Sequence, residues 1–200
     1  MVEDQIERRG ITDPAVLAAM RAVPRHRFVP SDQADAAYDD RALPIGFGQT
    51  ISQPYIVAFM TQALQLTPQH RVLEVGTGSG YQAAVLGQIV AEVQTIEIVP
   101  ALAERARALL AELGYSNVHV RTGDAYAGLP ELAPFDRIIV TAAPDHAPQP
   151  LIDQLAEGGR MIVPVGIAQQ QLILITKAPA GVQCEPLLDV VFVPLTRSAG

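Results

Sequence analysis

The sequence contains one cysteine, Cys184, in a chain of 200 residues. A single thiol excludes an internal disulfide, so a buried core must stabilise the fold, and this length is sufficient to form one. The residues that follow, Glu185 and Pro186, provide no base that would activate the thiol. We therefore interpret Cys184 as a passive structural residue.

Clusters of lysine and arginine are also absent, and the formal net charge is -7. Binding nucleic acid requires a basic surface that displaces counterions, so nucleic acid is not expected as a partner. The start of the chain is charged and has no apolar signal core, and no later stretch is as long as a membrane span. The sequence predicts a cytoplasmic protein without a membrane partner, and we expect a monomer.

The four histidines, His26, His70, His119 and His146, are scattered along the chain. No pair stands at the spacing of metal ligands, and no arrangement of cysteine or serine with histidine indicates an activated nucleophile. No metal site is expected, and each histidine is interpreted as a surface or cap residue. Any catalysis must then depend mainly on the positioning of the reactants.

The most informative segment that is present is the run from Val72 to Tyr81, which reads VLEVGTGSGY. An apolar strand leads directly into three glycines at alternate positions. Glycine tolerates the backbone angles of a tight strand-to-helix turn and lets main-chain N–H groups approach a ligand closely. The run predicts a loop that binds a nucleotide-containing cofactor, and the alternative is a sharp turn that binds nothing.

The spacing of these glycines distinguishes between cofactors. A dinucleotide fingerprint needs its third glycine at the position of Tyr81, so the G-x-G-x-x-G pattern is not matched. A second apolar strand, expected at Val93 to Ile98, carries Glu97 near its end. An acid there accepts hydrogen bonds from ribose hydroxyls in either cofactor class. The combination favours S-adenosyl-L-methionine over a nicotinamide dinucleotide.

Strand and helix patterns alternate along the middle of the chain, which is typical of a parallel doubly wound sheet. Strands are expected at 72–75, 93–98, 118–121, 137–142, 161–165, 171–176 and 190–193. Helices are expected from Asp13-Pro14, from Pro54 to before Pro68, and at 81–89, 100–113 and 149–155. The last two strands are joined without a helix and should therefore pair antiparallel.

This order is similar to the class I S-adenosylmethionine-dependent methyltransferase fold. That fold is α/β and Rossmann-like, with a mostly parallel seven-stranded sheet and a C-terminal antiparallel hairpin. We expect a single domain in three regions. Residues 1–53 form a helical cap with the substrate-side segment, 54–166 form the cofactor-binding core, and 167–200 complete the sheet.

Two further segments, Gly46-Phe-Gly-Gln-Thr-Ile-Ser-Gln-Pro-Tyr55 and Phe192-Val-Pro-Leu-Thr196, are more specific than the glycine loop. With the loop and Val163-Pro-Val-Gly166, they resemble the protein-L-isoaspartate (D-aspartate) O-methyltransferase family over nearly the whole chain. The resemblance implies methyl transfer from S-adenosyl-L-methionine to the free α-carboxyl of L-isoaspartyl residues in damaged proteins and peptides. The product S-adenosyl-L-homocysteine is released, the ester collapses to a succinimide, and the implied function is protein repair.

The same resemblance places the family's catalytic serine at Ser52. A hydroxyl can orient a carboxylate acceptor while remaining inert, and an acceptor carboxyl with a pKa of roughly 3.3 to 3.9 is already ionised and needs no general base. In the alternative interpretation, Ser52 only caps the helix that begins near Pro54. Other residues expected to contact the acceptor are Thr50, Ile51, Gln53, Val57 and Thr196.

Two acids in the cofactor half keep alternative interpretations. Glu74, inside the first strand, either braces the loop N–H groups as a buried carboxylate or contacts the sulfonium and amino end of the cofactor. Asp124, just past a strand end, either accepts from the adenine amino group or caps a turn. The expected cofactor contacts are Glu74, Gly76, Thr77, Gly78, Ser79, Gly80, Tyr81, Glu97, Asp124 and Ala125.

Three other functions share part of this pattern. A methyltransferase of a different acceptor would need everything except the Ser52 segment. A non-catalytic cofactor-binding relative is disfavoured by the intact Ser52 segment. A nicotinamide-dependent dehydrogenase is disfavoured by Tyr81 and by the lack of an acid or base for a hydride site.

Overall fold

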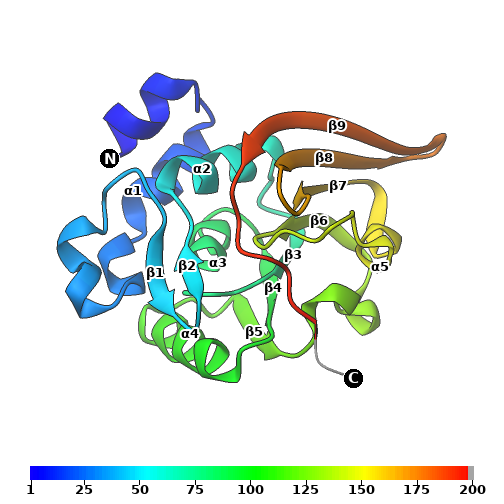
Figure 1. Ribbon diagram of the computed structural model, residues 1–200. Coiled ribbons are helices and arrows are strands. Elements are labelled where there is room, and N and C mark those ends of the chain that lie inside the picture. The colour runs from blue at the N-terminus through cyan, green and yellow to red at the C-terminus, as the bar shows by residue number, and fades with distance from the viewer. Residues whose placement is uncertain (198–200) are drawn as a thin grey trace.

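Seven strands form one central sheet in the computed structural model, which describes residues 1–197 (Figure 1). The strand order is β5-β4-β3-β6-β7-β8-β9. The strands are β3 (Arg71–Val75), β4 (Glu92–Glu97), β5 (Val118–Thr122), β6 (Phe135–Val140), β7 (Leu155–Val165), β8 (Gln170–Ala178) and β9 (Gly181–Val190).

The strands from β3 to β7 pair in parallel, as the alternation of strands and helices predicts. The chain builds outward from β3 to β4 and β5, and then returns to the other side of β3 with β6. The strand order therefore reverses at β3. The carboxyl ends of β3, β4 and β6 meet at this switch point, where open α/β sheets bind their ligands.

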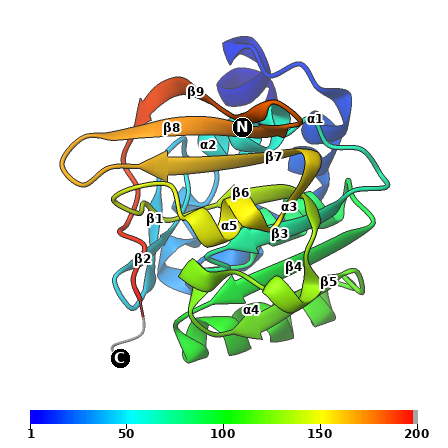
Figure 2. The same cartoon turned by 90° about the vertical axis from the view of Figure 1, so that its right-hand side faces the viewer.

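Helices cover both faces of the sheet (Figure 2). The helices are α1 (Pro14–Ala22), α2 (Pro54–Ala63), α3 (Tyr81–Gly87), α4 (Pro100–Glu112) and α5 (Gln149–Asp153), with short 3-10 turns η5 (Ala125–Ala127) and η6 (Pro130–Leu132). Helices α1 to α4 pack on the face of Val72, and α5 packs on the face of Leu73. Successive strand residues point to opposite faces, and Val72, Leu73 and Val75 of β3 are apolar because both faces of the sheet are buried. The predicted fold class is confirmed.

The C-terminal strands run antiparallel, since β8 pairs antiparallel with both β7 and β9. The antiparallel end of the sheet is thus as predicted, but the expected last strand at 190–193 is wrong. The strand β9 ends at Val190, and the apolar run after it leaves the sheet. The sequence pattern misses β9 because it is an edge strand with mostly exposed residues and no continuous apolar signal.

Short helices and one small hairpin make up the N-terminal region. Helix α1 begins after Asp13 as expected, and the Asp13 carboxylate accepts from the N–H of Ala15 at 2.8 Å. The other elements are η1 (Val2–Ile6), η2 (Glu7–Arg9), η3 (Arg25–Phe28), η4 (Ser31–Ala36), β1 (Leu43–Gly46) and β2 (Gln49–Ile51). The β1–β2 hairpin was not expected, because Pro44 and Gly46 interrupt its short apolar pattern.

Two polar side chains, one of them fully buried, fasten this region to the sheet-covering helices. Arg25 is fully buried, its Nε donates to the carbonyl of Ala37 at 2.7 Å, and its guanidinium lies 4.8 Å from the ring centre of Tyr81 on α3. Burial lowers the pKa of Arg25 to about 10. On α2, Gln62 Oε1 accepts from the N–H of Asp13 at 2.9 Å. The N-terminal region is therefore attached to the helices that border the switch point.

No helix within residues 1–197 combines the length and apolar character needed to cross a membrane.

Candidate active site

A cavity lies at the switch point, and six separate parts of the chain line it: 49–57, 76–82, 97–98, 125, 141–142 and 193–196. We call the residues from the glycine loop and the strand ends the cofactor side: Gly76, Thr77, Gly78, Ser79, Tyr81, Gln82, Glu97, Ile98, Ala125, Thr141 and Ala142. We call the remaining residues the acceptor side: Gln49, Thr50, Ile51, Ser52, Val57, Val193, Pro194, Leu195 and Thr196. The fold brings residues that lie almost 150 positions apart in the sequence (49 to 196) into one cavity.

The glycine loop requires glycine for two reasons. Gly76 has φ +98°, and a Cβ atom there would lie 2.5 Å from the hydroxyl oxygen of Thr141. Gly80 has φ +86° and stands at the start of α3 against Ala106 of α4. Backbone N–H groups of Gly76 and Thr77 donate to the carbonyl of Ile96, at 2.9 and 3.3 Å. The main chain itself holds the loop against the end of β4.

Glu97 connects the end of β4 to this loop. Its side chain is buried, Oε2 accepts from the N–H of Gly78 at 2.7 Å, and Oε1 accepts from the N–H of Val99 at 2.9 Å. A carboxylate has about four lone-pair sites, so both oxygens keep acceptor capacity toward the cavity. The arrangement suits a ligand with a pair of hydroxyl groups, which is the chemistry of a ribose.

Glu74 is a buried side chain, as the first sequence interpretation expects, but its contacts differ from those of both interpretations. It is completely buried and is not among the residues that line the cavity. Its Oε2 accepts from the hydroxyl of Thr95, which lies 2.6 Å from the hydroxyl of Thr77 in the loop. Its Oε1 has no hydrogen-bond partner among the described residues, and burial raises the pKa of Glu74 to about 8. Glu74 thus reaches the loop through two threonine hydroxyls and not through loop N–H groups.

The remaining expected cofactor residues divide between the cavity and its support. Ser79 Oγ accepts from the N–H of Tyr81 at 3.2 Å, and the Tyr81 hydroxyl lies 3.9 Å from the sulfur of Met20. Ala125 lines the cavity. Asp124 caps the turn η5 by accepting from the N–H of Tyr126 at 3.0 Å, and it stays a prediction as an adenine contact.

The first part of the acceptor side runs from β2 to the first turn of α2. Ser52 is half-buried and lines both the cavity and an adjoining groove. Thr50, Ile51 and Val57 also line the cavity, whereas Gln53 lies in the groove. The N-cap residue of α2 is Gln53, and its side chain makes no capping hydrogen bond. The interpretation of Ser52 as the helix cap is therefore wrong, because the cap position is the next residue.

The rest of the acceptor side comes from residues 191–197, which we call the C-terminal strap (the red segment of Figure 1). The backbone of Ala143 donates to Val193 and accepts from Leu195, each at 2.8 Å. The side chain of Gln170 contacts the backbone of Phe192 through both its amide nitrogen and its oxygen. These contacts place Thr196 at the cavity, as expected for an acceptor-side residue.

Thr141 and Gln82 are cavity residues that the sequence argument does not identify. Thr141 directly follows β6, just as the acid Glu97 ends β4, so its place after an apolar strand was an available signal. The Thr141 hydroxyl is 2.6 Å from the carbonyl oxygen of Gly76. Gln82 has no such signal, because its side chain is held by a hydrogen bond to the hydroxyl of Thr61 on α2 at 3.0 Å, a contact that forms only in the folded chain.

The residues present fit S-adenosyl-L-methionine. A buried carboxylate stands at the end of the second strand for the ribose, and a glycine loop lies beside it at the switch point. Within residues 1–197, no group of three or more histidine, cysteine, aspartate and glutamate side chains is arranged to hold a metal ion. The sheet order and this cavity define a class I S-adenosyl-L-methionine-dependent methyltransferase.

The chain belongs to the protein-L-isoaspartate(D-aspartate) O-methyltransferase family, whose family model matches residues 1–200. It is 58% identical over 199 residues to the protein-L-isoaspartate O-methyltransferase of Gloeobacter violaceus, with 98% of this chain and 97% of that protein covered.

Solved structures give the same result. A protein-L-isoaspartate O-methyltransferase superposes with a TM-score of 0.88 at 31% identity, and the match covers 97% of this chain but 65% of that longer chain. A Plasmodium falciparum beta-aspartate methyltransferase in complex with S-adenosyl-L-homocysteine superposes with a TM-score of 0.85 at 29% identity, with 98% and 96% covered.

Proposed function

We propose that this chain transfers a methyl group from S-adenosyl-L-methionine to the free α-carboxyl of L-isoaspartyl residues in damaged proteins and peptides. The resulting ester closes to a succinimide, which begins the repair. The observation that carries the proposal is that the Ser52 segment and the glycine loop line one cavity. Family membership supports the same activity.

When bound, the cofactor would supply an electrophilic methyl group on its sulfonium sulfur, and the product would be S-adenosyl-L-homocysteine once the acceptor oxygen has taken that methyl. Glu97 accepts from the ribose hydroxyls, and the glycine loop lets its backbone lie against the ligand. The acceptor carboxyl has an ordinary pKa of roughly 3.3 to 3.9, so it is ionised at neutral pH and no residue needs to remove a proton. The protein therefore acts mainly by aligning the two reactants, which can lower the activation barrier by on the order of 7 to 11 kcal/mol.

Ser52 orients the acceptor in this proposal. Its hydroxyl donates to one carboxylate oxygen, so that the other oxygen faces the methyl group. Three features support this role: the side chain is half-buried, it lines the cavity, and it does not serve as the cap of α2. Thr50, Ile51, Val57 and Thr196 surround the acceptor, and Gln53 borders the adjoining groove.

We further propose that the protein works as a monomer in the cytoplasm and without a nucleic acid partner. The net charge of -7 supports the last point, because a phosphate backbone would be repelled.

The test is transfer of labelled methyl to two short peptides that differ only in having isoaspartate or aspartate at one position. We expect label in the isoaspartyl peptide alone. Label in neither peptide, with S-adenosyl-L-methionine bound in calorimetry, would favour a different acceptor or a non-catalytic binding protein. Equal label in both would show that the site does not recognise the isoaspartyl linkage.

A further inference from the structure

The N-terminus of α2 is capped by a residue from outside the helix. The first helical residue, Pro54, has no N–H to satisfy, and the next, Tyr55, donates its N–H to Oδ1 of Asp40 at 3.3 Å. An aspartate oxygen that accepts from the second N–H of a helix is the usual capping interaction, but the capping residue normally immediately precedes the helix. Here the carboxylate comes from 15 residues upstream.

Asp40 also holds the residue between Ser52 and the helix. The side-chain amide nitrogen of Gln53 donates to the backbone carbonyl of Asp40 at 2.9 Å and to its carboxylate Oδ2 at 2.8 Å. An amide nitrogen has two hydrogens, so both donors of Gln53 are used on the same residue. Asp40 thereby holds the side chain of the residue that follows Ser52 and, through the N–H of Tyr55, the start of α2.

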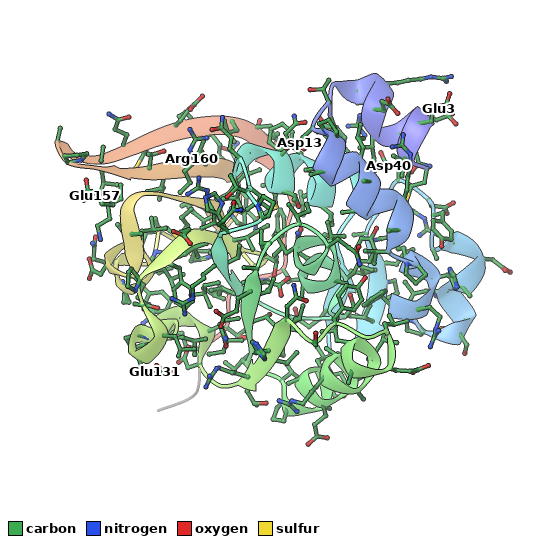
Figure 3. The ribbon with its side chains drawn as sticks, turned by 180° about the vertical axis from the view of Figure 1, so that it is seen from behind. Glu3, Asp13, Asp40, Glu131, Glu157 and Arg160 are labelled. Atoms are coloured by element: carbon green, nitrogen blue, oxygen red, sulfur yellow. The ribbon has the colours of Figure 1, made fainter. Side chains whose placement is uncertain are left out.

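A third contact fixes the carboxylate itself. Arg9, from the N-terminal turn η2, pairs with Asp40 Oδ2 at 2.6 Å, and its guanidinium lies 3.5 Å from the ring centre of Tyr55. In Figure 3, which shows the molecule from behind, Asp40 is labelled beside the N-terminal helices. Asp40 is therefore held between the N-terminal turn and the start of α2, and only about a quarter of its side chain (24%) is exposed.

None of these contacts uses the hydroxyl of Ser52. A serine before a helix ordinarily uses its hydroxyl as the cap, and the hydroxyl is then unavailable to a ligand. Asp40 takes over the capping of α2, while Ser52 stays in the cavity wall.

We propose that Asp40 is a positioning residue for methyl transfer: it fixes the Ser52–Tyr55 turn from outside and so reserves the Ser52 hydroxyl for the acceptor carboxyl. The proposal rests on the proposed function, in which Ser52 orients that carboxyl. Asp40 does not touch the acceptor or the cofactor, and it acts through the backbone of the turn that carries Ser52.

The first experiment measures kcat and KM of Asp40→Ala with an isoaspartyl peptide, together with the Kd for S-adenosyl-L-methionine. We expect kcat to fall by on the order of 10- to 10²-fold, because small misplacements of a positioning group have effects of this size. The cofactor Kd should not change, because the cofactor side is held by separate contacts. The matched control is Asp39→Ala, which removes an exposed neighbouring carboxylate paired with Arg41 and should keep wild-type kcat.

The decisive experiment repeats Asp40→Ala in a Ser52→Ala background. If Asp40 acts through Ser52, the second substitution has no hydroxyl left to misplace and kcat falls no further. A purely structural role of Asp40 would lower kcat by the same factor in both backgrounds. Asp40→Asn is the second variant: it keeps an oxygen for the Tyr55 N–H, but an amide nitrogen replaces Oδ2, so it loses the acceptor of the Gln53 amide and the charge that faces Arg9. It should fold if Asp40→Ala does not, and its smaller loss of kcat should also vanish in the Ser52→Ala background.

Wild-type kcat in both Asp40 variants, or equal factors in the two backgrounds, would overturn this inference and leave the proposed function standing. A parallel loss of cofactor affinity would also overturn it, because the whole site would then have collapsed. The proposed role of Ser52 fails separately, if Ser52→Ala alone retains wild-type turnover. The proposed activity fails separately again, if the wild-type protein does not label the isoaspartyl peptide.

Discussion

The two sides of the cavity are built by different means. On the cofactor side, Gly76 and Thr77 donate backbone N–H groups to a strand carbonyl, and Glu97 binds the loop N–H of Gly78. On the acceptor side, the turn after Ser52 depends on the side chain of Asp40, and the side chain of Gln170 joins two backbone hydrogen bonds to Ala143 in holding the C-terminal strap.

This difference has a physical consequence. The cofactor side belongs to the buried sheet, so its geometry follows from strand pairing and from glycine. The acceptor side is assembled from segments that begin and end outside the sheet, so single side chains decide where it lies. Substitutions on the acceptor side should therefore alter turnover, and substitutions on the cofactor side should alter affinity or stability.

The largest effect should come from Ser52→Ala. Loss of one positioned donor to a reacting oxygen typically lowers kcat by on the order of 10²-fold or more, and the cofactor Kd should stay at the wild-type value. Steady-state kinetics with the isoaspartyl peptide and calorimetry with S-adenosyl-L-methionine check the two halves of the prediction. Ser116→Ala, in an exposed turn, is the control. A parallel loss of cofactor affinity would contradict the separation of the two sides.

Glu97→Ala should give the next largest effect, and it should appear in cofactor affinity. Hydrogen bonds to a charged group contribute about 1.5 to 3 kcal/mol each, so the Kd should rise roughly tenfold or more. Glu92→Ala, at the other end of β4 and paired with Arg71, is the matched control and should bind normally. An unchanged Kd for Glu97→Ala in calorimetry would refute the ribose contact.

Gly76→Ala should lower the free energy of unfolding by about 1 to 3 kcal/mol, the usual range for backbone strain of this kind. The strain has two sources, since φ is +98° and the new Cβ meets Thr141. Gly114→Ala is a useful control because φ is +83° but nothing lies within 4 Å of its Cβ. The difference between the two variants in urea unfolding therefore isolates the contact with Thr141, and equal losses would show that this contact is absent.

The last effect concerns Glu74, and it appears as a dependence of stability on pH, small within any single pH unit. Burial raises the pKa of Glu74 from 4.5 to about 8, so the folded protein holds this proton more tightly than the unfolded chain. The contribution to stability is complete at low pH and is lost as the pH rises toward about 8.

Glu74→Gln keeps the neutral shape and removes the titration. The difference in free energy of unfolding between this variant and the wild type should therefore grow in favour of the variant as the pH rises in this range, by at most about 1.4 kcal/mol per pH unit. Urea unfolding at several pH values checks the slope. The exposed control Glu104→Gln should show no such trend, and a pH-independent difference for Glu74→Gln would contradict the prediction.

The core of the fold could be predicted because its signals are local. The apolar run of β3, the glycines after it and the acid that ends β4 lie within 27 residues (71–97), and each strand is buried on both faces. The edge strand β9 and the β1–β2 hairpin could not be predicted in the same way. Exposed residues remove the apolar pattern from β9, and Pro44 and Gly46 interrupt the pattern of β1.

The candidate site was predictable to the same extent. Ser52, Glu97 and the loop glycines stand in segments with a recognisable spacing, and the structure places Ser52, Glu97, Gly76 and Gly78 at one cavity, whereas Gly80 packs against α4. Asp40 has no such signal, since its partners are Arg9, Gln53 and Tyr55, and only the folded chain brings them together. The network of Glu74 with Thr95 was also hidden, because neighbouring strands supply its two ends.

Because the cap of α2 comes from a distant residue, it determines the shortest segment around Ser52 that could be transplanted into another protein. A short motif copied into another methyltransferase scaffold, from Thr50 to Pro54, would arrive without the carboxylate that satisfies the N–H of Tyr55. The N–H of the second helical residue would then have no acceptor, and the serine hydroxyl would be the nearest group to replace the carboxylate. A transplant intended to preserve the orientation of Ser52 must carry residues 40–55 as one piece, together with an arginine placed like Arg9.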